Sequence, residues 1–256
     1  MRTAGIIVAL ALSGLAVSGA QARNDAPTIT QGNGLVFRYY AGAGYRFQPL
    51  LSFGNLNAVV STRDVVATRR LATALLARST RVGDALYWRY DFSFGGSAPG
   101  WTSGFTQAVA AQALARTAVL LRDPSYARAA AAAFRALRRD LVMPLGGGLW
   151  IREYSFTHQA ILNAQLESVL AVESYARIAK TRVALRVANE LEHAARTLLP
   201  QFDVGGWGRY ELGGPRADLH YETYHVDLLR RLALRHREPI WRATYLRWQA
   251  CLPKER

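Results

Sequence analysis

Cysteine is nearly absent from this sequence, since Cys251 is the single cysteine in 256 residues. One cysteine cannot form a disulfide within the chain, and it excludes metal sites built from several thiolates. The folded state therefore depends on the packing of apolar residues, which make up 50% of the chain. This fraction and this length suffice for one continuous hydrophobic core.

Lysine is also scarce, so the positive charge is almost wholly arginine. The only lysines are Lys180 and Lys254, whereas Lys and Arg together number 32 against 18 acidic residues, giving a net charge of +14. A field of this sign attracts polyanions, whether nucleic acid, anionic lipid or acidic polysaccharide. A genome rich in arginine codons would produce the same excess.

Long apolar runs are missing beyond the N-terminus, so no later segment is expected to cross a membrane. Residues 1–22 combine one basic residue, Arg2, with an apolar run over residues 6–17 and a small-residue end at Ala22. This layout predicts a cleavable secretory signal, whereas an anchor helix would need about 20 apolar residues. We expect a secreted or periplasmic protein, cleaved near Ala22, without stable membrane insertion and without a nucleic-acid partner.

The remaining chain is patterned mainly for helices. Aromatics and glycines over residues 35–53 favour a strand pair or an extended arm. Apolar residues then recur at helical spacing over residues 56–77, 101–121, 124–141, 157–178, 183–199, 219–235 and 239–250. Six or seven helices joined by alternating short and long loops predict stacked helical hairpins. The expected fold is all-α: an incomplete or complete α/α toroid over residues 56–256, preceded by a short β-hairpin or extended arm over residues 23–55.

Four segments near the expected loops combine aromatics with glycine and charge: residues 87–104, 152–154, 205–212 and 221–225. A sugar-binding cleft needs such residues, because a pyranose stacks its apolar face on a ring and offers hydroxyls at its edge. Structural tryptophans in a core would give a similar pattern. The occurrence of four such segments at the same end of successive hairpins favours a glycan-binding site.

Five ordered motifs identify a family that this chain resembles. They are Trp101 to Gln107, Glu153-Tyr154 with Leu162-Asn163, Leu198 to Asp203 with Tyr210-Glu211-Leu212, Tyr221 with His225, and Arg247-Trp248. A further match over residues 44–56 extends the similarity to nearly the whole mature chain. In this order the motifs resemble the catalytic C-terminal region of D-glucuronyl C5-epimerases. These enzymes invert C5 of a uronic acid in an acidic polysaccharide of the heparan sulfate type.

The resemblance implies which residues carry the chemistry. The C5 hydrogen is alpha to the carboxylate, so its removal builds a dianionic enolate that needs a nearby base and charge neutralisation. The family's catalytic positions correspond to Glu153, Tyr154, Tyr210 and Tyr221. The candidates for substrate binding are Tyr45, Arg89, Trp101, Gln107, Asn163, Arg209 and His225.

Two of these candidates have further expected roles. We expect Arg209 or Arg89 to lower the pKa of a tyrosine and to grip the substrate carboxylate. His225 either orients a tyrosine and stabilises the enolate, or is a helix histidine bonded to a backbone carbonyl.

Several positions depart from the family pattern and keep alternatives open. Arg152, Ser155 and Gly213 stand where the family has Glu, Pro and, in animal enzymes, Arg. The β-rich insertion of the animal enzymes has no room between residues 55 and 101. A uronate polysaccharide lyase on the same fold and a non-catalytic acidic-glycan-binding protein remain as alternatives.

Cofactors and assembly complete the expectations. No paired histidine and carboxylate motif is present, so no cofactor and no catalytic metal are expected, while loop oxygens leave a structural Ca²⁺ open. Dimerisation is typical of the family, so the resemblance implies a homodimer.

Overall fold

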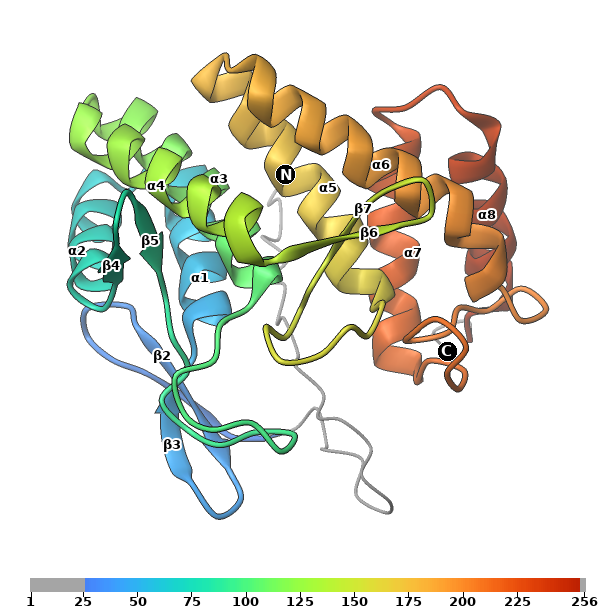
Figure 1. Ribbon diagram of the computed structural model, residues 1–256, viewed down its shortest axis with the longest axis horizontal. Helices are drawn as coiled ribbons and strands as arrows, with labels where there is room; N and C mark the ends of the chain where they lie inside the picture. Colours follow the sequence, from blue (N-terminus) through green and yellow to red (C-terminus); the bar gives the residue numbers. More distant parts are fainter. Residues whose placement is uncertain (1–25, 254–256) are drawn as a thin grey trace, which may run out of the picture. The chain divides into compact units, whose positions relative to one another are not determined.

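The computed structural model describes residues 26–253, so the secretory signal expected at residues 1–22 lies outside the described residues (Figure 1). Two compact units are distinguished. Unit 1 comprises the described residues up to Thr102 together with Val109–Ala136, and unit 2 comprises Ser103–Ala108 and the chain from Leu137 onward. Over residues 26–253, no helix is long and apolar enough to cross a bilayer.

Unit 1 begins with a three-stranded antiparallel sheet. Its strands are β1 (Thr28–Thr30), β2 (Val36–Tyr40) and β3 (Gly44–Phe47), in the order β1-β2-β3. Gly42 and Gly44 have φ values of 78° and 74°, a region that glycine enters without steric cost, and they allow the tight turn between β2 and β3. The expected strand pair is present and is extended by β1.

Two helices follow, α1 (Pro49–Ser61) and α2 (Val65–Ala77). They replace the single helix expected over residues 56–77. The break lies at Asp64, whose carboxylate accepts a hydrogen bond from the Ala67 N–H at 2.9 Å and so starts a new helix. Because α1 already begins before residue 55, the boundary expected there between arm and helical domain falls inside a helix.

The rest of unit 1 is a second helical hairpin with a short strand pair before it. The elements are β4 (Thr80–Val82), β5 (Ala85–Tyr87), α3 (Gly104–Leu121) and α4 (Pro124–Asp140). Ser103 caps α3, because its Oγ accepts a hydrogen bond from the Thr106 N–H at 3.2 Å. Helices α3 and α4 each belong partly to unit 2.

Unit 2 contains two helical hairpins and a strand pair, which packs against the first hairpin (Figure 1). The strands are β6 (Val142–Leu145) and β7 (Gly148–Ile151), and the helices are α5 (Leu162–Ala179), α6 (Arg182–Phe202), α7 (Leu219–Ala233) and α8 (Pro239–Cys251). Helix α5 packs against both α6 and α7, and β7 lies against α6. A Cβ at Gly148 would stand 2.3 Å from the Glu190 carbonyl oxygen, so this close approach requires glycine.

Tryptophans fill the core. All six are buried, and Trp207, with 8% exposure, is the most accessible of them. In unit 2, Trp150 stacks on Phe202 with ring centroids 5.6 Å apart. Their burial supports the structural interpretation of the tryptophans, so a sugar-stacking surface on this chain must come from other rings.

Candidate functional site

The structure brings together the four residues to which the family resemblance assigns catalysis. Glu153 and Tyr154 follow β7, Tyr210 lies in the loop between α6 and α7, and Tyr221 lies in the first turn of α7. The rings of Tyr210 and Tyr221 are 4.6 Å apart between centroids. Tyr154 is electrostatically coupled to the other three. We call Glu153, Tyr154, Tyr210 and Tyr221 the Glu–Tyr cluster; it lies within unit 2.

Backbone pairing places Tyr210 in this cluster. The Leu162 N–H donates to the Tyr210 carbonyl at 3.0 Å, and the Leu212 N–H donates to the Ala160 carbonyl at 2.9 Å. An isolated antiparallel bridge joins Ile161 to Glu211. The loop that carries Tyr210 is thereby fixed to the start of α5.

Helix capping places Tyr221. The Asp218 carboxylate accepts a hydrogen bond from the Tyr221 N–H at 2.9 Å and forms the N-cap of α7. The cap fixes the first turn of the helix, where Tyr221 is 3% exposed. His225 lies four residues further on, so it shares the helix face of Tyr221.

Glu153 is a buried carboxyl that titrates near neutral pH. It is 1% exposed, and within residues 26–253 its Oε2 has no hydrogen-bond partner. Burial raises the pKa of Glu153 to about 8, and a hydrogen bond with Tyr154 offsets only part of this rise. Both protonation states of Glu153 are therefore accessible around neutral pH.

Tyr154 holds its proton firmly. Burial raises the pKa of Tyr154 well above its usual value, and the neighbouring Glu153, Tyr210 and Tyr221 raise it further. The expectation that an arginine lowers a tyrosine pKa does not hold for Tyr154, because the pKa of Tyr154 is raised, with burial as the largest cause. At neutral pH this phenol is a hydrogen-bond donor.

His225 lies beside the cluster and is fully buried. Its Nδ1 is 3.5 Å from Glu222 Oε2, and among residues 26–253 neither ring nitrogen forms a hydrogen bond. The alternative of a histidine bonded to a backbone carbonyl is therefore wrong. The ring centroids of His225 and Tyr221 are 6.5 Å apart.

Glu222 is a functional candidate that the motif comparison missed. It is fully buried, and its Oε2 accepts a hydrogen bond from the Gly208 N–H at 2.8 Å. The same carboxylate faces His225 one helical turn away. The spacing of Glu222 and His225, three residues apart on one helix, is the sequence signal that indicates this pair.

Three substrate-binding candidates also lie in unit 2. Gln107 on α3 is fully buried, and Asn163 on α5 is 2% exposed, with its Oδ1 buried and unpaired within the described residues. The Arg209 guanidinium donates to the Gly214 carbonyl oxygen, so it braces the loop after the Tyr210 segment. Asn163 therefore has a buried oxygen that the described residues do not satisfy, whereas one Arg209 donor is already engaged by the protein.

The other three candidates lie in unit 1. Tyr45 on β3 is 45% exposed, and the exposed Arg89 donates to the Gly100 carbonyl at 2.9 Å. Trp101 is 6% exposed and stacks on Tyr90 with centroids 3.8 Å apart and planes nearly parallel. Trp101 is thus part of an aromatic core, and Tyr45 is the candidate whose ring is accessible.

Two further motif segments have a structural connection. The Asp203 carboxylate, at the end of α6, accepts hydrogen bonds from Arg247 and from the Trp248 Nε1–H, the latter at 2.9 Å. The C-terminal helix α8 is thereby fastened to the loop that leads toward Tyr210. This contact explains the presence of both motifs without a direct role in chemistry.

One group of acids and histidine over residues 26–253 brings metal-type ligand atoms within 4.8 Å of one another: Glu192, His236 and Glu238. Glu192 Oε1 already accepts a hydrogen bond from the Trp241 Nε1–H at 3.2 Å, and His236 Nε2 lies 2.6 Å from a Glu173 oxygen. None of these residues belongs to the Glu–Tyr cluster. We assign no metal to this group.

Comparison with known proteins identifies relatives of this chain. Residues 83–250 match the family described as the D-glucuronyl C5-epimerase C-terminus. An uncharacterized protein of Methanocaldococcus jannaschii is 26% identical over 178 residues, which covers 64% of this chain. The chain spans 57% of the length of that relative.

Two solved structures share the fold. An endoglucanase of glycosyl hydrolase family 8 from Klebsiella pneumoniae matches with a TM-score of 0.62 at 15% identity, covering 88% of this chain and 76% of that one. An endo-β-1,4-glucanase from Acetobacter xylinum matches with a TM-score of 0.56 at 11% identity, covering 79% and 72%. Both are α/α toroid enzymes, so the expected fold class is confirmed. At these identities the similarity concerns the fold alone.

Proposed function

The chain belongs to the D-glucuronyl C5-epimerase C-terminal family, and from that premise we propose that it inverts C5 of a uronic acid within an acidic polysaccharide. The observation that carries the proposal is the buried Glu–Tyr cluster. A carboxyl with a pKa near neutrality lies among three tyrosines, and this set contains both a base and proton donors. No cofactor is needed for such a proton exchange.

Glu153 is the group we assign as the base. Its pKa of about 8 makes its carboxylate a stronger base than an ordinary one, while a fraction remains ionised at neutral pH. In the proposed step, the Glu153 carboxylate takes the C5 proton, and the electron pair of the C–H bond moves into the uronate carboxyl group to form an enolate. Neutral phenols nearby donate hydrogen bonds to the developing charge.

Tyr221 is the group we assign as the proton donor for the opposite face of the sugar. Its hydroxyl proton passes to C5 and leaves a tyrosinate, while Glu153 holds the proton it removed. The cluster has then gained one proton and lost one, so a transfer from Glu153 to the tyrosinate restores the starting state. Tyr154 interacts with Glu153, Tyr210 and Tyr221, and Tyr210 lies against Tyr221, so we assign this return path to Tyr154 and Tyr210.

A purely binding protein fits the cluster less well. A buried carboxyl with an unpaired oxygen destabilises the folded state, and a binding site has no need of such a group. Catalysis does need it, because desolvation is what brings the pKa of Glu153 close to neutrality. The lyase alternative shares the first proton abstraction and differs in the fate of the enolate.

Incubation with heparosan and other uronate polymers in deuterated water tests these functions together. Epimerisation places deuterium at C5, which NMR detects, and it leaves the polymer length unchanged. Elimination instead produces an unsaturated uronate that absorbs ultraviolet light and shortens the polymer. Binding without label at C5 and without ultraviolet absorption would contradict both reactions and support the binding protein.

A further inference from the structure

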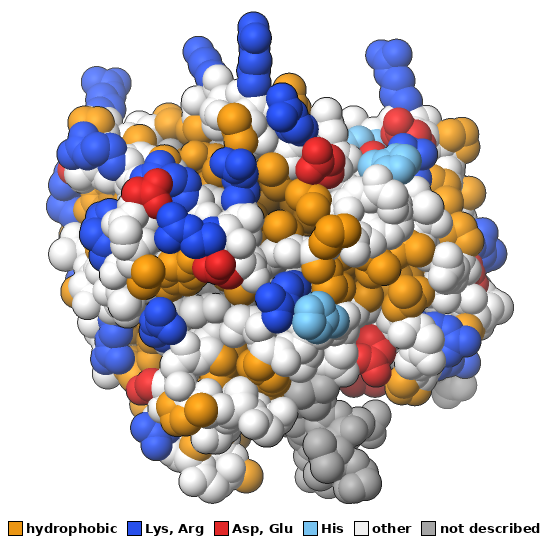
Figure 2. Space-filling model, viewed as in Figure 1, with side chains coloured by type: hydrophobic (Ala, Val, Ile, Leu, Met, Phe, Trp, Pro, Cys, Tyr) orange, Lys and Arg blue, Asp and Glu red, His pale blue; other side chains and the backbone are white. Residues whose placement is uncertain are grey.

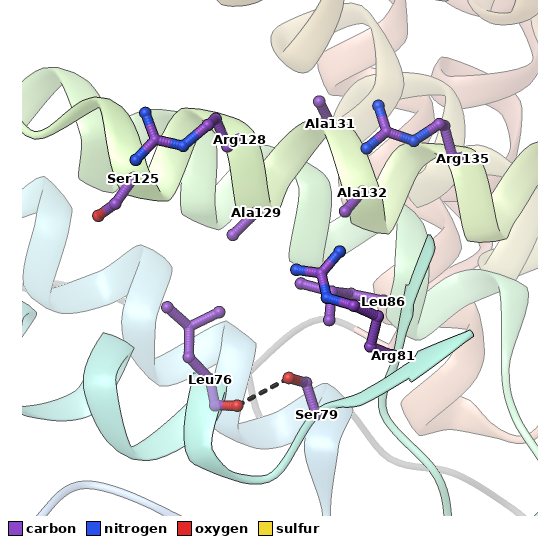
Figure 3. Close-up of a pocket in the computed structure, with 10 residues that line it drawn as sticks. All are labelled: Leu76, Ser79, Arg81, Leu86, Ser125, Arg128, Ala129, Ala131, Ala132 and Arg135. Carbon is purple, nitrogen blue, oxygen red and sulfur yellow. Dashed lines mark hydrogen bonds between the residues drawn. The ribbon is translucent and has the colours of Figure 1, made fainter. Parts of the chain in front are cut away.

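A basic groove lies in unit 1, between α4 on one side and the end of α2 with the β4–β5 pair on the other (Figure 3). It has a volume of about 610 Å³. Arg81, Arg128 and Arg135 are its charged lining residues, and no acidic side chain lines it. We call it the arginine groove; it shares no residue with the Glu–Tyr cluster.

The three arginines differ in how the protein uses them. Arg135 pairs with the Asp84 carboxylate at 2.9 Å and also donates to the Asp84 carbonyl. Arg81 and Arg128 are exposed, and within residues 26–253 no hydrogen bond or ion pair engages either guanidinium, although Arg128 does attract the Asp123 carboxylate. Two complete sets of guanidinium donors are therefore available to an anionic ligand.

The groove surface between the arginines is apolar and made partly of small side chains. Ala131 and Ala132 lie on α4 between Arg128 and Arg135, and Leu86 lies opposite with 5% exposure (Figure 3). Arg128 and Arg135 are seven residues apart on α4, which corresponds to about 10 Å along its axis, and Arg81 extends the row of cations to β4. A ligand that fits must combine an apolar face with negative groups repeated along its length.

Alternative anionic ligands fit this shape less well. A single inorganic anion offers one charged group, whereas the free guanidinium groups come from opposite sides of the groove, Arg81 from β4 and Arg128 from α4. A membrane surface would need apolar side chains that project into the lipid, whereas this groove is concave and its helical floor is alanine. An extended sugar polymer offers both ring faces and repeated carboxylates. Figure 2 shows Lys and Arg side chains scattered over the visible face, so only a difference between variants of equal charge can reveal a defined site.

We propose that the arginine groove is a second binding site for an acidic polysaccharide. Arg81 and Arg128 grip successive carboxylate or sulfate groups, and the sugar rings lie over Leu86 and the α4 alanines. The choice of a uronate polymer as ligand rests on the proposed function. Binding in the groove does not depend on turnover in the Glu–Tyr cluster.

The test compares two double variants that lose the same charge. Arg81→Ala with Arg128→Ala removes the free guanidinium groups of the groove. Arg70→Ala with Arg242→Ala removes two exposed arginines outside it, and is the control. Titration calorimetry with heparosan oligosaccharides measures Kd, with equal thermal melting confirming that both variants fold. We expect the groove variant to bind at least about tenfold more weakly than the control, the usual effect of losing one charged contact or more.

Turnover gives a second measurement. Loss of binding away from the reacting atoms raises KM and leaves kcat of C5 exchange unchanged. Equal Kd values in the two double variants would overturn the proposal, because the overall positive field would then explain all binding. Equally large groove-dependent binding of inorganic phosphate, or of vesicles containing anionic lipid, would overturn the assignment to a polysaccharide. Groove-dependent binding without C5 exchange by the parent protein would support the groove and refute only the epimerase function.

Discussion

At the residue scale, burial sets the protonation states on which the proposed chemistry depends. Glu153 has a pKa raised to about 8, and Tyr154 keeps its proton at any pH near neutrality. Both shifts have desolvation as their largest cause, so they follow mainly from burial within unit 2, and for Tyr154 the neighbouring Glu153 and tyrosines add to the shift. Arg89 and Arg209, which we expected to shift a tyrosine pKa, donate hydrogen bonds to the backbone carbonyls of Gly100 and Gly214.

The first residue-scale prediction compares Tyr221 with Tyr224, which lie one turn apart on α7. Tyr221→Phe removes one hydroxyl and keeps the ring, so we expect C5 exchange to fall roughly 100-fold or more, as for loss of a general acid. Tyr224 is outside the cluster, and its hydroxyl donates to Glu167 at 3.4 Å. Tyr224→Phe should change exchange little. Equal rates in the two variants, measured by NMR of deuterium incorporation, would remove Tyr221 from the mechanism.

The second prediction concerns Glu153 and pH. Its pKa is about 8 in the folded state and about 4.3 in an unfolded chain. Between these two pH values the folded state binds more protons than the unfolded chain. The free energy of unfolding is therefore highest at low pH, where Glu153 is protonated, and declines as pH rises. The decline should approach about 1.4 kcal/mol per pH unit at most. Glu153→Gln should remove this dependence and make the protein more stable than the parent at pH near 8.

Urea unfolding at several pH values measures this effect, and C5 exchange measures the catalytic one. Glu153→Gln should lose exchange roughly 100-fold or more, because an amide cannot accept the proton. Glu190→Gln changes a carboxylate on α6 outside the cluster and serves as the control. Full exchange activity in Glu153→Gln would show that another group is the base.

The family resemblance proposed all four residues of the cluster but not the groups that surround them. Motif positions identified the four cluster residues because each lies in a distinct local pattern. Glu222 and the aromatic stack around Trp101 depend on contacts between segments far apart in the chain, which local patterns do not encode. Burial also decides whether a tryptophan meets a sugar or the core, and it cannot be read from residue type.

At the scale of elements, helix caps position the chemistry. Asp218 accepts from the Tyr221 N–H at 2.9 Å, and Asp64 accepts from the Ala67 N–H at the same distance at the start of α2. Both caps are aspartates that accept a hydrogen bond from a backbone N–H, but only one of the two helices contains a residue of the Glu–Tyr cluster. Helix α7 carries Tyr221, whereas α2 carries no residue of the cluster.

This pair gives the third prediction. Asp218→Ala and Asp64→Ala should each destabilise the protein by about 1 kcal/mol, measured by urea unfolding, because each leaves helix N–H groups unpaired. Only Asp218→Ala should also lower kcat of C5 exchange, since the freed first turn of α7 no longer fixes Tyr221. Equal loss of kcat in both variants would mean that global stability, rather than placement of Tyr221, limits activity.

The periodicity of apolar residues predicts most helix boundaries, but it misses boundaries that are set by side-chain contacts. Helices α4, α6, α7 and α8 lie within a few residues of their expected bounds. Helix α5 begins at Leu162 rather than near residue 157, because Arg152 donates to the Ser155 and Thr157 carbonyls and holds that segment as a loop. These local contacts of Arg152, with residues three and five positions further on, thus move a boundary that helical periodicity alone places earlier.

At the scale of the whole molecule, charge and fold are separate properties. The α/α toroid fold follows from helical periodicity and is shared with enzymes at 10 to 15% identity, so the fold tolerates very different surfaces. The net charge of +14 is a property of this particular chain. This charge attracts polyanions at long range, before any specific contact forms.

The last prediction separates these charges from compositional bias. Binding to heparosan should weaken at least about tenfold between about 0.01 M and 0.15 M salt, because the screening length falls from about 30 Å to about 8 Å over that range. Calorimetric Kd values at four or more salt concentrations measure the slope. Removing Arg81 and Arg128 should flatten that slope more than removing Arg70 and Arg242, since only contacts within the screening length at high salt persist. If the affinity were independent of salt, the arginine excess would reflect codon bias. Long-range electrostatic attraction would then play no part in binding by this protein.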